Sequence, residues 1–158
     1  MKVLLVEPPK KTWELMGQCV SPPLGLAQLA AVLEEAGIGV DIVDCNAQNL
    51  GWSQLAGVIG EQRPDVIGAT AMTPFFYQAL RVMEIAKGVD HSIVTVLGGP
   101  HVTFTPEETL LEHPEVDFIV RGEGERTLIQ LVRCLEAKQD PCQVKGIALR
   151  QNDSIVLT

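Results

Sequence analysis

Three apolar segments of the chain are followed by glycines or hydroxyl side chains, and not by strong acids, bases or nucleophiles. Thr70 follows DVIGA, Gly98-Gly99 follows SIVTVL, and Gly122 and Gly124 follow DFIVR. Hydroxyl groups and bare backbone hold a ligand through shape and hydrogen bonds. This set therefore predicts a site for a bulky, mostly neutral ligand.

The cysteines do not have the spacing of a metal site. Cys19, Cys45, Cys134 and Cys142 lie far apart and include no C-x-x-C pair. Because zinc sites and iron–sulfur clusters need closely spaced cysteine or histidine ligands, we expect neither of them and assign no metal ligands. Reduced, buried thiols are the simpler interpretation and are typical of a cytoplasmic protein.

Composition indicates one globular domain with neither nucleic acid nor membrane as a partner. The chain has 158 residues, 46% hydrophobic and 20% charged, and a formal net charge of -8. Phosphate backbones and acidic lipids bind clustered lysines and arginines, which are spread thinly here. The N-terminal apolar run meets Glu7 and two prolines, so it is too short for a signal peptide or a membrane span. We expect a cytoplasmic protein.

Alternating strand and helix patterns predict an α/β fold. Strands are expected at residues 2–7, 40–44 and 65–71, and from residues 92 and 117. Apolar residues at i, i+3, i+4 and i+7 predict helices between them, and a capping box predicts a short helix from Thr105. Continuously apolar strands are typical of a parallel sheet covered on both faces. We therefore expect a Rossmann-like (flavodoxin-like) five-stranded parallel sheet, order 2-1-3-4-5, with helices on both faces.

The carboxyl ends of these strands form the expected ligand edge. In this strand order ligands bind beyond those ends, near the switch point between strands one and three. The edge is predicted to gather Glu7 to Pro9, Thr70 to Pro74, Gly98 to His101 and Arg121 to Glu125. The last residues, GIALRQNDSIVLT, predict a β-hairpin, and because the chain stops inside its second strand we expect a longer polypeptide.

Several familiar uses of this architecture are excluded by their own residues. EPPKKTW follows the first strand, where a dinucleotide site needs G-x-G-x-x-G, and no P-loop is present. A phospho-acceptor domain needs an acidic cluster where only Glu7 is found. A flavodoxin needs a hydroxyl- and glycine-rich phosphate loop after the first strand, which two prolines and two lysines do not supply. A catalytic triad needs a nucleophile elbow, and the sequence has no obvious one.

The same edge segments carry a resemblance to a known family. TAM, Thr70 to Met72, followed by Gly98-Gly99, resembles the S-x-L and Gly-Gly elements of cobalamin-binding proteins. Over nearly the whole chain, four segments resemble the N-terminal B12-binding domain of B12-dependent radical S-adenosylmethionine proteins: PPLGLAQLAAVLEEAG, AMTP, LGGPHVT and VRGEGE.

The resemblance implies that the benzimidazole tail of cobalamin enters among the carboxyl ends of the strands. Gly98-Gly99 would lack side chains because the tail lies against the backbone there, and Thr70 would offer its hydroxyl in place of the family serine. The implied cofactor-binding residues are Pro9, Thr70, Met72, Thr73, Pro74, Gly98, Gly99, Pro100, His101, Val102, Gly122, Glu123 and Gly124.

One departure concerns cobalt. The branch similar to methionine synthase carries D-x-H-x-x-G after the first strand, and this chain has no histidine there. The resemblance then implies a displaced tail and no protein imidazole below cobalt.

The resemblance also implies a parent methyltransferase or a related radical enzyme such as an anaerobic cyclase, with a [4Fe-4S] cluster and S-adenosylmethionine in an absent radical SAM domain. Residues 1–140 would bind cobalamin, residues 141–158 would lead onward, and the chain alone would catalyse nothing.

Alternatives remain at this stage. Gly98-Gly99 also suits a simple strand end, and RGEGE also suits acids at a helix start. His101 is expected to be a loop residue hydrogen-bonded to backbone, while Trp13 and Met16 either cover the corrin face or pack onto the body. A different class of function is a stand-alone small α/β nucleotide-binding enzyme or regulatory domain, which the missing phosphate loop disfavours.

Overall fold

The computed structural model describes residues 1–9, 21–152 and 154–158. Trp13, Met16 and Cys19 therefore lie outside the described residues. The strands are β1 (Lys2–Glu7), β2 (Gly39–Asp44), β3 (Val66–Thr70), β4 (Val94–Gly98), β5 (Phe118–Val120), β6 (Ile147–Gln151) and β7 (Ser154–Leu157). The helices are α1 (Leu24–Glu35), α2 (Trp52–Gln62), α3 (Phe76–Val89), α4 (Pro100–Phe104), α5 (Pro106–Glu112) and α6 (Glu125–Glu136), with 3-10 turns η2 (Thr73–Phe75) and η3 (Pro141–Gln143).

The sheet has the order β2-β1-β3-β4-β5-β6-β7. Its first five members pair in parallel in the predicted order, which confirms the Rossmann-like α/β fold. The predicted hairpin is also present, but it extends the same sheet, because β6 pairs antiparallel with β5. A five-stranded sheet was therefore too small an expectation: the hairpin pattern predicts two strands and does not say which edge they join.

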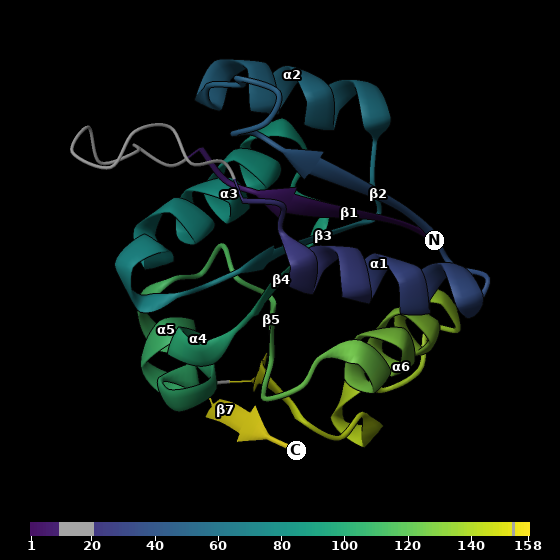
Figure 1. Cartoon of the computed structure of the whole chain (residues 1–158). Helices are drawn as coiled ribbons and strands as arrows, with labels where there is room; N and C mark the ends of the chain where they lie inside the picture. Colours follow the sequence, from purple (N-terminus) through teal and green to yellow (C-terminus); the bar gives the residue numbers. More distant parts are fainter. Residues whose placement is uncertain (10–20, 153) are drawn as a thin grey trace.

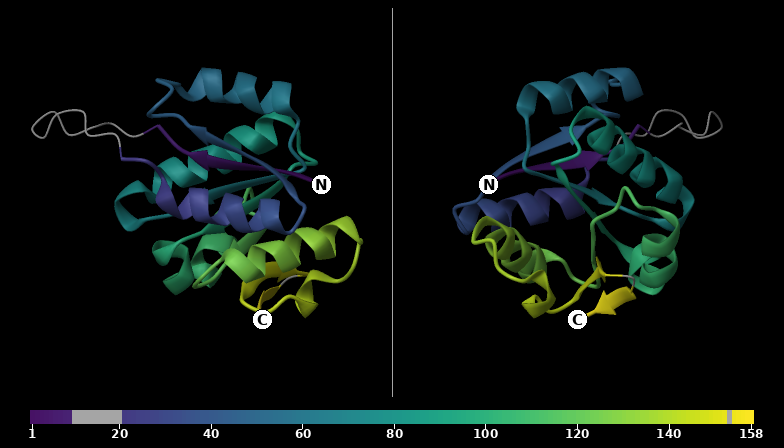
Figure 2. Two further views of the ribbon diagram at one scale, coloured as in Figure 1. Left: turned by 45° about the vertical axis from the view of Figure 1, so that its right-hand side comes forward. Right: turned by 180° about the vertical axis from the view of Figure 1, so that it is seen from behind.

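Helices cover both faces of the sheet (Figure 1). On one face α1 and α6 lie next to each other, and their apolar residues pack with those of the strands around Leu33, Val96 and Leu131. On the other face α2, α3, α4 and α5 pack around Ile67, Met83 and Leu97 (Figure 2). Strands buried on both faces explain the continuous apolar runs in the sequence.

The ends of α1 and α5 agree with the sequence in all but one respect. α1 begins directly after Pro22-Pro23, and Gly37 follows its end with φ 75°. α5 begins at Pro106 as predicted, but Thr105 makes no side-chain cap; its hydroxyl donates to the carbonyl of His101 at 3.0 Å. The capping-box prediction is wrong because the Thr105 side chain is turned back toward the preceding α4, where its hydroxyl donates, and does not accept from an amide of α5.

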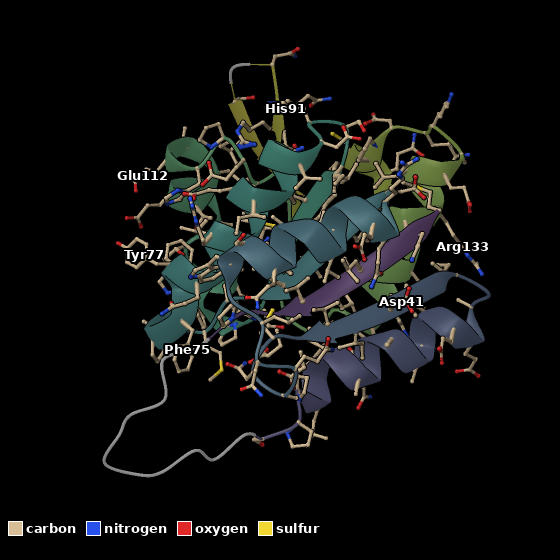
Figure 3. The ribbon with its side chains drawn as sticks, turned by 90° about the horizontal axis from the view of Figure 1, so that it is seen from above. Asp41, Phe75, Tyr77, His91, Glu112 and Arg133 are labelled. Atoms are coloured by element: carbon tan, nitrogen blue, oxygen red, sulfur yellow. The ribbon has the colours of Figure 1, made fainter. Side chains whose placement is uncertain are left out.

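The carboxyl ends of the strands gather at one edge of the molecule. Figure 3 shows Phe75 and Tyr77, which follow β3, at this edge, and Arg133, in the last turn of α6, at the opposite one. Helices that run antiparallel to the strands bring their N-termini to the carboxyl edge. The loops that follow β3, β4 and β5 therefore meet the starts of α1 and α6.

Candidate functional site

Two glycines on one face of the sheet leave a trough in it. The parallel register places Leu5, Gly68 and Val96 in one row across β1, β3 and β4, and Thr70 and Gly98 in the next row toward the carboxyl edge. Residues in register point to the same face of a sheet. Because the middle of the first row and one position of the second have no side chain, the surface under α1 and α6 is hollowed there.

The hollow is a cavity of about 160 Å³ between the sheet and the starts of α1 and α6. We call it the trough. It opens at the carboxyl edge of the strands. Its lining consists of Leu5, Gly25, Leu26, Leu29, Gly68, Ala69, Thr70, Val96, Gly98, Gly99, Val120, Gly122, Glu123, Gly124, Glu125 and Leu128.

The adjacent glycines after β4 have different reasons to be glycine. At Gly99 φ is 98°, and a Cβ there would lie 2.8 Å from Thr70 Cγ2 and 2.9 Å from the carbonyl oxygen of Ala71, so the fold itself requires glycine. At Gly98 a Cβ would meet only the carbonyl oxygen of Val120, at an ordinary 3.7 Å. The protein's own packing therefore does not explain Gly98, and a methyl group there would point into the trough.

The loop after β5 forms one wall of the trough and leads into α6. Gly122 has φ 67°, a conformation that favours glycine, and Gly124 is the N-cap residue of α6. The hydroxyl of Thr103 ties this loop to the one after β4. Glu125 lies in the first turn of α6, where the helix dipole favours an acid. Glu123 lines the trough, and ligand binding by this segment stays a prediction.

A second hollow, of about 270 Å³, adjoins the mouth of the trough. The two share Gly25, Leu26 and Thr70, and the second also contains Met72 and Phe75 together with Glu7 and the residues that lead into α1. Among the residues that the structure describes, none hydrogen-bonds to the Thr70 hydroxyl, so it is available to a ligand where the two hollows meet.

The structure brings only part of the predicted residues into the trough. Thr70, Gly98, Gly99, Gly122, Glu123 and Gly124 line it. Pro9, Met72, Thr73, Pro74 and Pro100 lie outside it at the carboxyl edge. Pro9 and Met72 are in loops, Thr73 and Pro74 are in η2, and Pro100 begins α4; all of them except Pro9 are exposed.

His101 and Val102 need correction. His101 lies in α4 and not in a loop; its ring contacts that of Phe76 in a tilted arrangement with centroids 4.2 Å apart, and Nδ1 is 3.3 Å from Thr73 Oγ1. The side chain of Val102 is fully buried in the core on the opposite face of the sheet, so it does not line the trough. The five-residue helix explains both, because it turns these side chains away from α1 and α6.

The apolar part of the lining was not predicted. Leu5, Leu26, Leu29 and Leu128 belong to apolar strand and helix patterns, and such patterns alone do not separate a core side chain from one beside a cavity. Gly68 did carry a signal: it is an isolated glycine inside a buried strand, a position that indicates close approach of a ligand or another backbone.

Cys45, at the carboxyl end of β2, has the electrostatics of a structural thiol. Burial raises its pKa to about 11, with the charges of Asp44 and Glu7 acting in the same direction. The thiolate is the nucleophilic and metal-binding form of cysteine, so this side chain stays neutral at physiological pH. In the described ranges no group of three or more histidine, cysteine or acidic side chains is placed to hold a metal ion.

The comparisons with known proteins agree with this geometry. Residues 18–132 match the family described as the B12 binding domain. Over 157 residues the chain is 41% identical to an uncharacterized methyltransferase, PH0819, of Pyrococcus horikoshii, covering 98% of this chain and 34% of the relative. It is 39% identical to the anaerobic magnesium-protoporphyrin IX monomethyl ester cyclase of Rubrivivax gelatinosus, covering 99% of this chain and 29% of the relative.

A solved structure shows the same fold. The radical S-adenosylmethionine methyltransferase TsrM of Kitasatospora setae, with cobalamin and a [4Fe-4S] cluster bound, superposes with a TM-score of 0.81 at 22% identity, over 99% of this chain and 28% of that one. The chain thus spans about a third of the length of these relatives. The family match favours the cobalamin-binding interpretation over the nucleotide-binding one. The chain belongs to the B12-binding domain family, with the Rossmann-like fold found in cobalamin-dependent radical SAM enzymes.

Proposed function

We propose that this chain holds cobalamin with its nucleotide tail in the trough and its corrin ring over the carboxyl edge of the strands. The observation that carries the proposal is Gly98, whose missing side chain the protein's own packing does not require. With Gly68 it opens a narrow, largely apolar space that ends at the sheet. Such a space suits a flat aromatic group on a tether.

The proposed contacts follow from position. The nucleotide tail would lie between Thr70 and Gly98 on the sheet side and Gly122, Glu123 and Gly124 on the loop side, with Gly99 fixing the turn above it. The corrin ring would rest near the edge residues Pro9, Met72, Thr73, Pro74 and Pro100. When bound, cobalamin supplies the capacity to carry a methyl group; the chain's own residues hold and orient it.

We propose that no histidine of this chain binds cobalt from below. The three histidines are His91, His101 and His113, and none belongs to the segment that follows β1. His101 and His113 both pack against the ring of Phe76, on the face opposite the trough. In the reduced, paramagnetic Co(II) form, electron paramagnetic resonance of the bound cofactor is then expected to lack nitrogen superhyperfine splitting.

We also propose that the chain serves a catalytic part of the same polypeptide. The relatives named above are about three times as long, and the similar structure carries a [4Fe-4S] cluster that nothing in this chain is expected to bind. Residues 1–140 would be the carrier domain, and residues 141–158 would lead to a radical SAM domain of a methyltransferase or cyclase that uses S-adenosylmethionine. Neither nucleic acid nor membrane is proposed as a partner.

The proposed compartment is the cytoplasm. Cys45, Cys134 and Cys142, the cysteines within the described residues, are free, as expected in a reducing environment. None of the described helices has the length and hydrophobicity needed to cross a bilayer.

The test is direct reconstitution. The chain is mixed with hydroxocobalamin, free ligand is removed by gel filtration, and the visible spectrum is recorded. We expect one corrinoid retained per chain. A colourless protein after reconstitution at several ligand concentrations would refute the proposed function.

A further inference from the structure

The floor of the trough offers almost no hydrogen-bonding groups. Its deepest row consists of Leu5, Gly68 and Val96, and the other large apolar side chains of the lining are those of Leu26, Leu29, Val120 and Leu128. The backbone around Gly68 is committed to the sheet, because β3 pairs with β1 on one side and with β4 on the other. A ligand group that reaches this floor leaves water and meets only carbon and already paired amides.

The polar groups of the trough lie at its mouth. Thr70 is the last residue of β3, two residues beyond Gly68 and thus about 6–7 Å nearer the carboxyl edge. Glu123 and Glu125 stand where the loop enters α6. A ligand thus meets a polar entrance and an apolar end. The ligand group that enters deepest binds well only if it has no polar atoms that need hydrogen bonds.

Corrinoids share one ring but differ in the base at the tip of the nucleotide tail, which is a benzimidazole in cobalamin and a purine in others. Resting on the proposed function, we propose that the trough selects corrinoids by this base and prefers an apolar benzimidazole to a purine. Adenine carries ring nitrogens and an exocyclic amine, which would lose water at the floor and gain no partner. The methyl groups and carbon edge of dimethylbenzimidazole lose nothing there.

Size supports the same preference. The trough of about 160 Å³ is comparable to the engineered cavity of ~150 Å³ that holds benzene and stays free of water. It therefore has little room for a flat base together with waters that could satisfy a purine. Gly68 sets the depth, since a Cβ there would lie 3.0 Å from Leu5 Cδ2.

The experiment compares three corrinoids on the same chain by equilibrium titration: cobalamin, its adenine-containing analogue, and cobinamide, which has no nucleotide base. We expect cobalamin to bind at least about tenfold more tightly than the adenine analogue, the ratio expected for leaving a polar group unpaired. Cobinamide is expected to bind more weakly than cobalamin, because nothing fills the trough.

Two variants place a polar group among the apolar side chains of the trough, one in its deepest row and one on the side of α1. Val96→Thr keeps the volume and adds a hydroxyl, and Leu29→Gln adds an amide from a less buried position. Each is expected to reduce the cobalamin preference by about threefold or more. Val89→Thr makes the same change at the end of α3, outside the trough, and is expected to leave the ratio unchanged. If Val96→Thr destabilises the core too much to be titrated, Leu29→Gln still allows the ratio of the two affinities to be measured.

The outcomes separate the inference from the proposed function. Equal affinity for cobalamin and the adenine analogue, or a preference that neither of the two trough variants alters, would overturn the selectivity while leaving a cobalamin carrier. Equal binding of cobinamide would show that the tail does not occupy the trough and would overturn the inference as well. Binding of none of the three would refute the proposed function itself.

Discussion

The amide of Gly122 donates a hydrogen bond of 3.0 Å to the hydroxyl of Thr103. The same hydroxyl donates to the carbonyl of Gly99 at 2.9 Å, so one side chain joins the loops that follow β4 and β5. Both loops line the trough, one with Gly98-Gly99 and the other with Gly122, Glu123 and Gly124. Thr103 does not line the trough itself; it holds two of its walls at a fixed separation.

Replacing Thr103 by valine removes both hydrogen bonds and keeps the shape of the side chain. We expect the free energy of unfolding to fall by about 0.5–1.5 kcal/mol and corrinoid affinity to fall about three- to tenfold, because the two walls lose their link. Thr103→Ser keeps the hydroxyl and serves as the control. Urea unfolding and equilibrium titration measure the two effects; wild-type affinity in Thr103→Val would show that the link does not shape the site.

Gly99→Ala is expected to destabilise the fold strongly. A Cβ there would overlap the backbone of Ala71 at 2.9 Å, and φ is 98°, so the loss should be about 2–4 kcal/mol. Gly37→Ala is the matched control, since φ is 75° there but nothing lies within 4 Å of the added methyl. It should cost about 1–2 kcal/mol, the price of the conformation alone. Similar losses for both variants would mean that the contact with Ala71 is easily relieved.

The sequence predicts the scaffold well and the interior of the site poorly. Hydrophobic periodicity and the glycines and prolines at segment ends place β1 to β5, because each of these signals is local. The order of these strands follows because right-handed crossovers leave few topologies. The trough depends instead on which residues share a row across three strands, such as Leu5, Gly68 and Val96, and this register is not local. His101 and Val102 were misjudged because a helix of five residues gives no periodic pattern.

The glycine pair after β4 shows the same limit. In sequence the two glycines are equivalent, and one explanation was offered for both. In the structure Gly99 must be glycine because of its positive φ and its close approach to the backbone of Ala71. No such contact requires glycine at Gly98, which lines the trough. Only coordinates distinguish a glycine that the fold needs from one that leaves room for a ligand.

Cys45 should make stability depend on pH in the alkaline range. Its folded pKa of about 11 is above the value of 9.0 for an exposed thiol, so the folded state holds the proton more tightly. The stabilisation is fully present below pH 9 and is lost as pH rises through 11, by about 2–3 kcal/mol, because each pKa unit corresponds to about 1.4 kcal/mol. In Cys45→Ala this part of the slope should disappear in urea unfolding at pH 8 to 11. An unchanged slope would contradict the assignment.

The central claim is that Gly98 is glycine to admit a ligand, and one titration tests it most directly. Gly98→Ala is compared with wild type and with Gly57→Ala, an exposed helical position with no atom within 4 Å of the new methyl. The account predicts that Gly98→Ala folds with wild-type or higher stability yet binds hydroxocobalamin at least about tenfold more weakly, while Gly57→Ala binds normally. Wild-type affinity in a well-folded Gly98→Ala would contradict it.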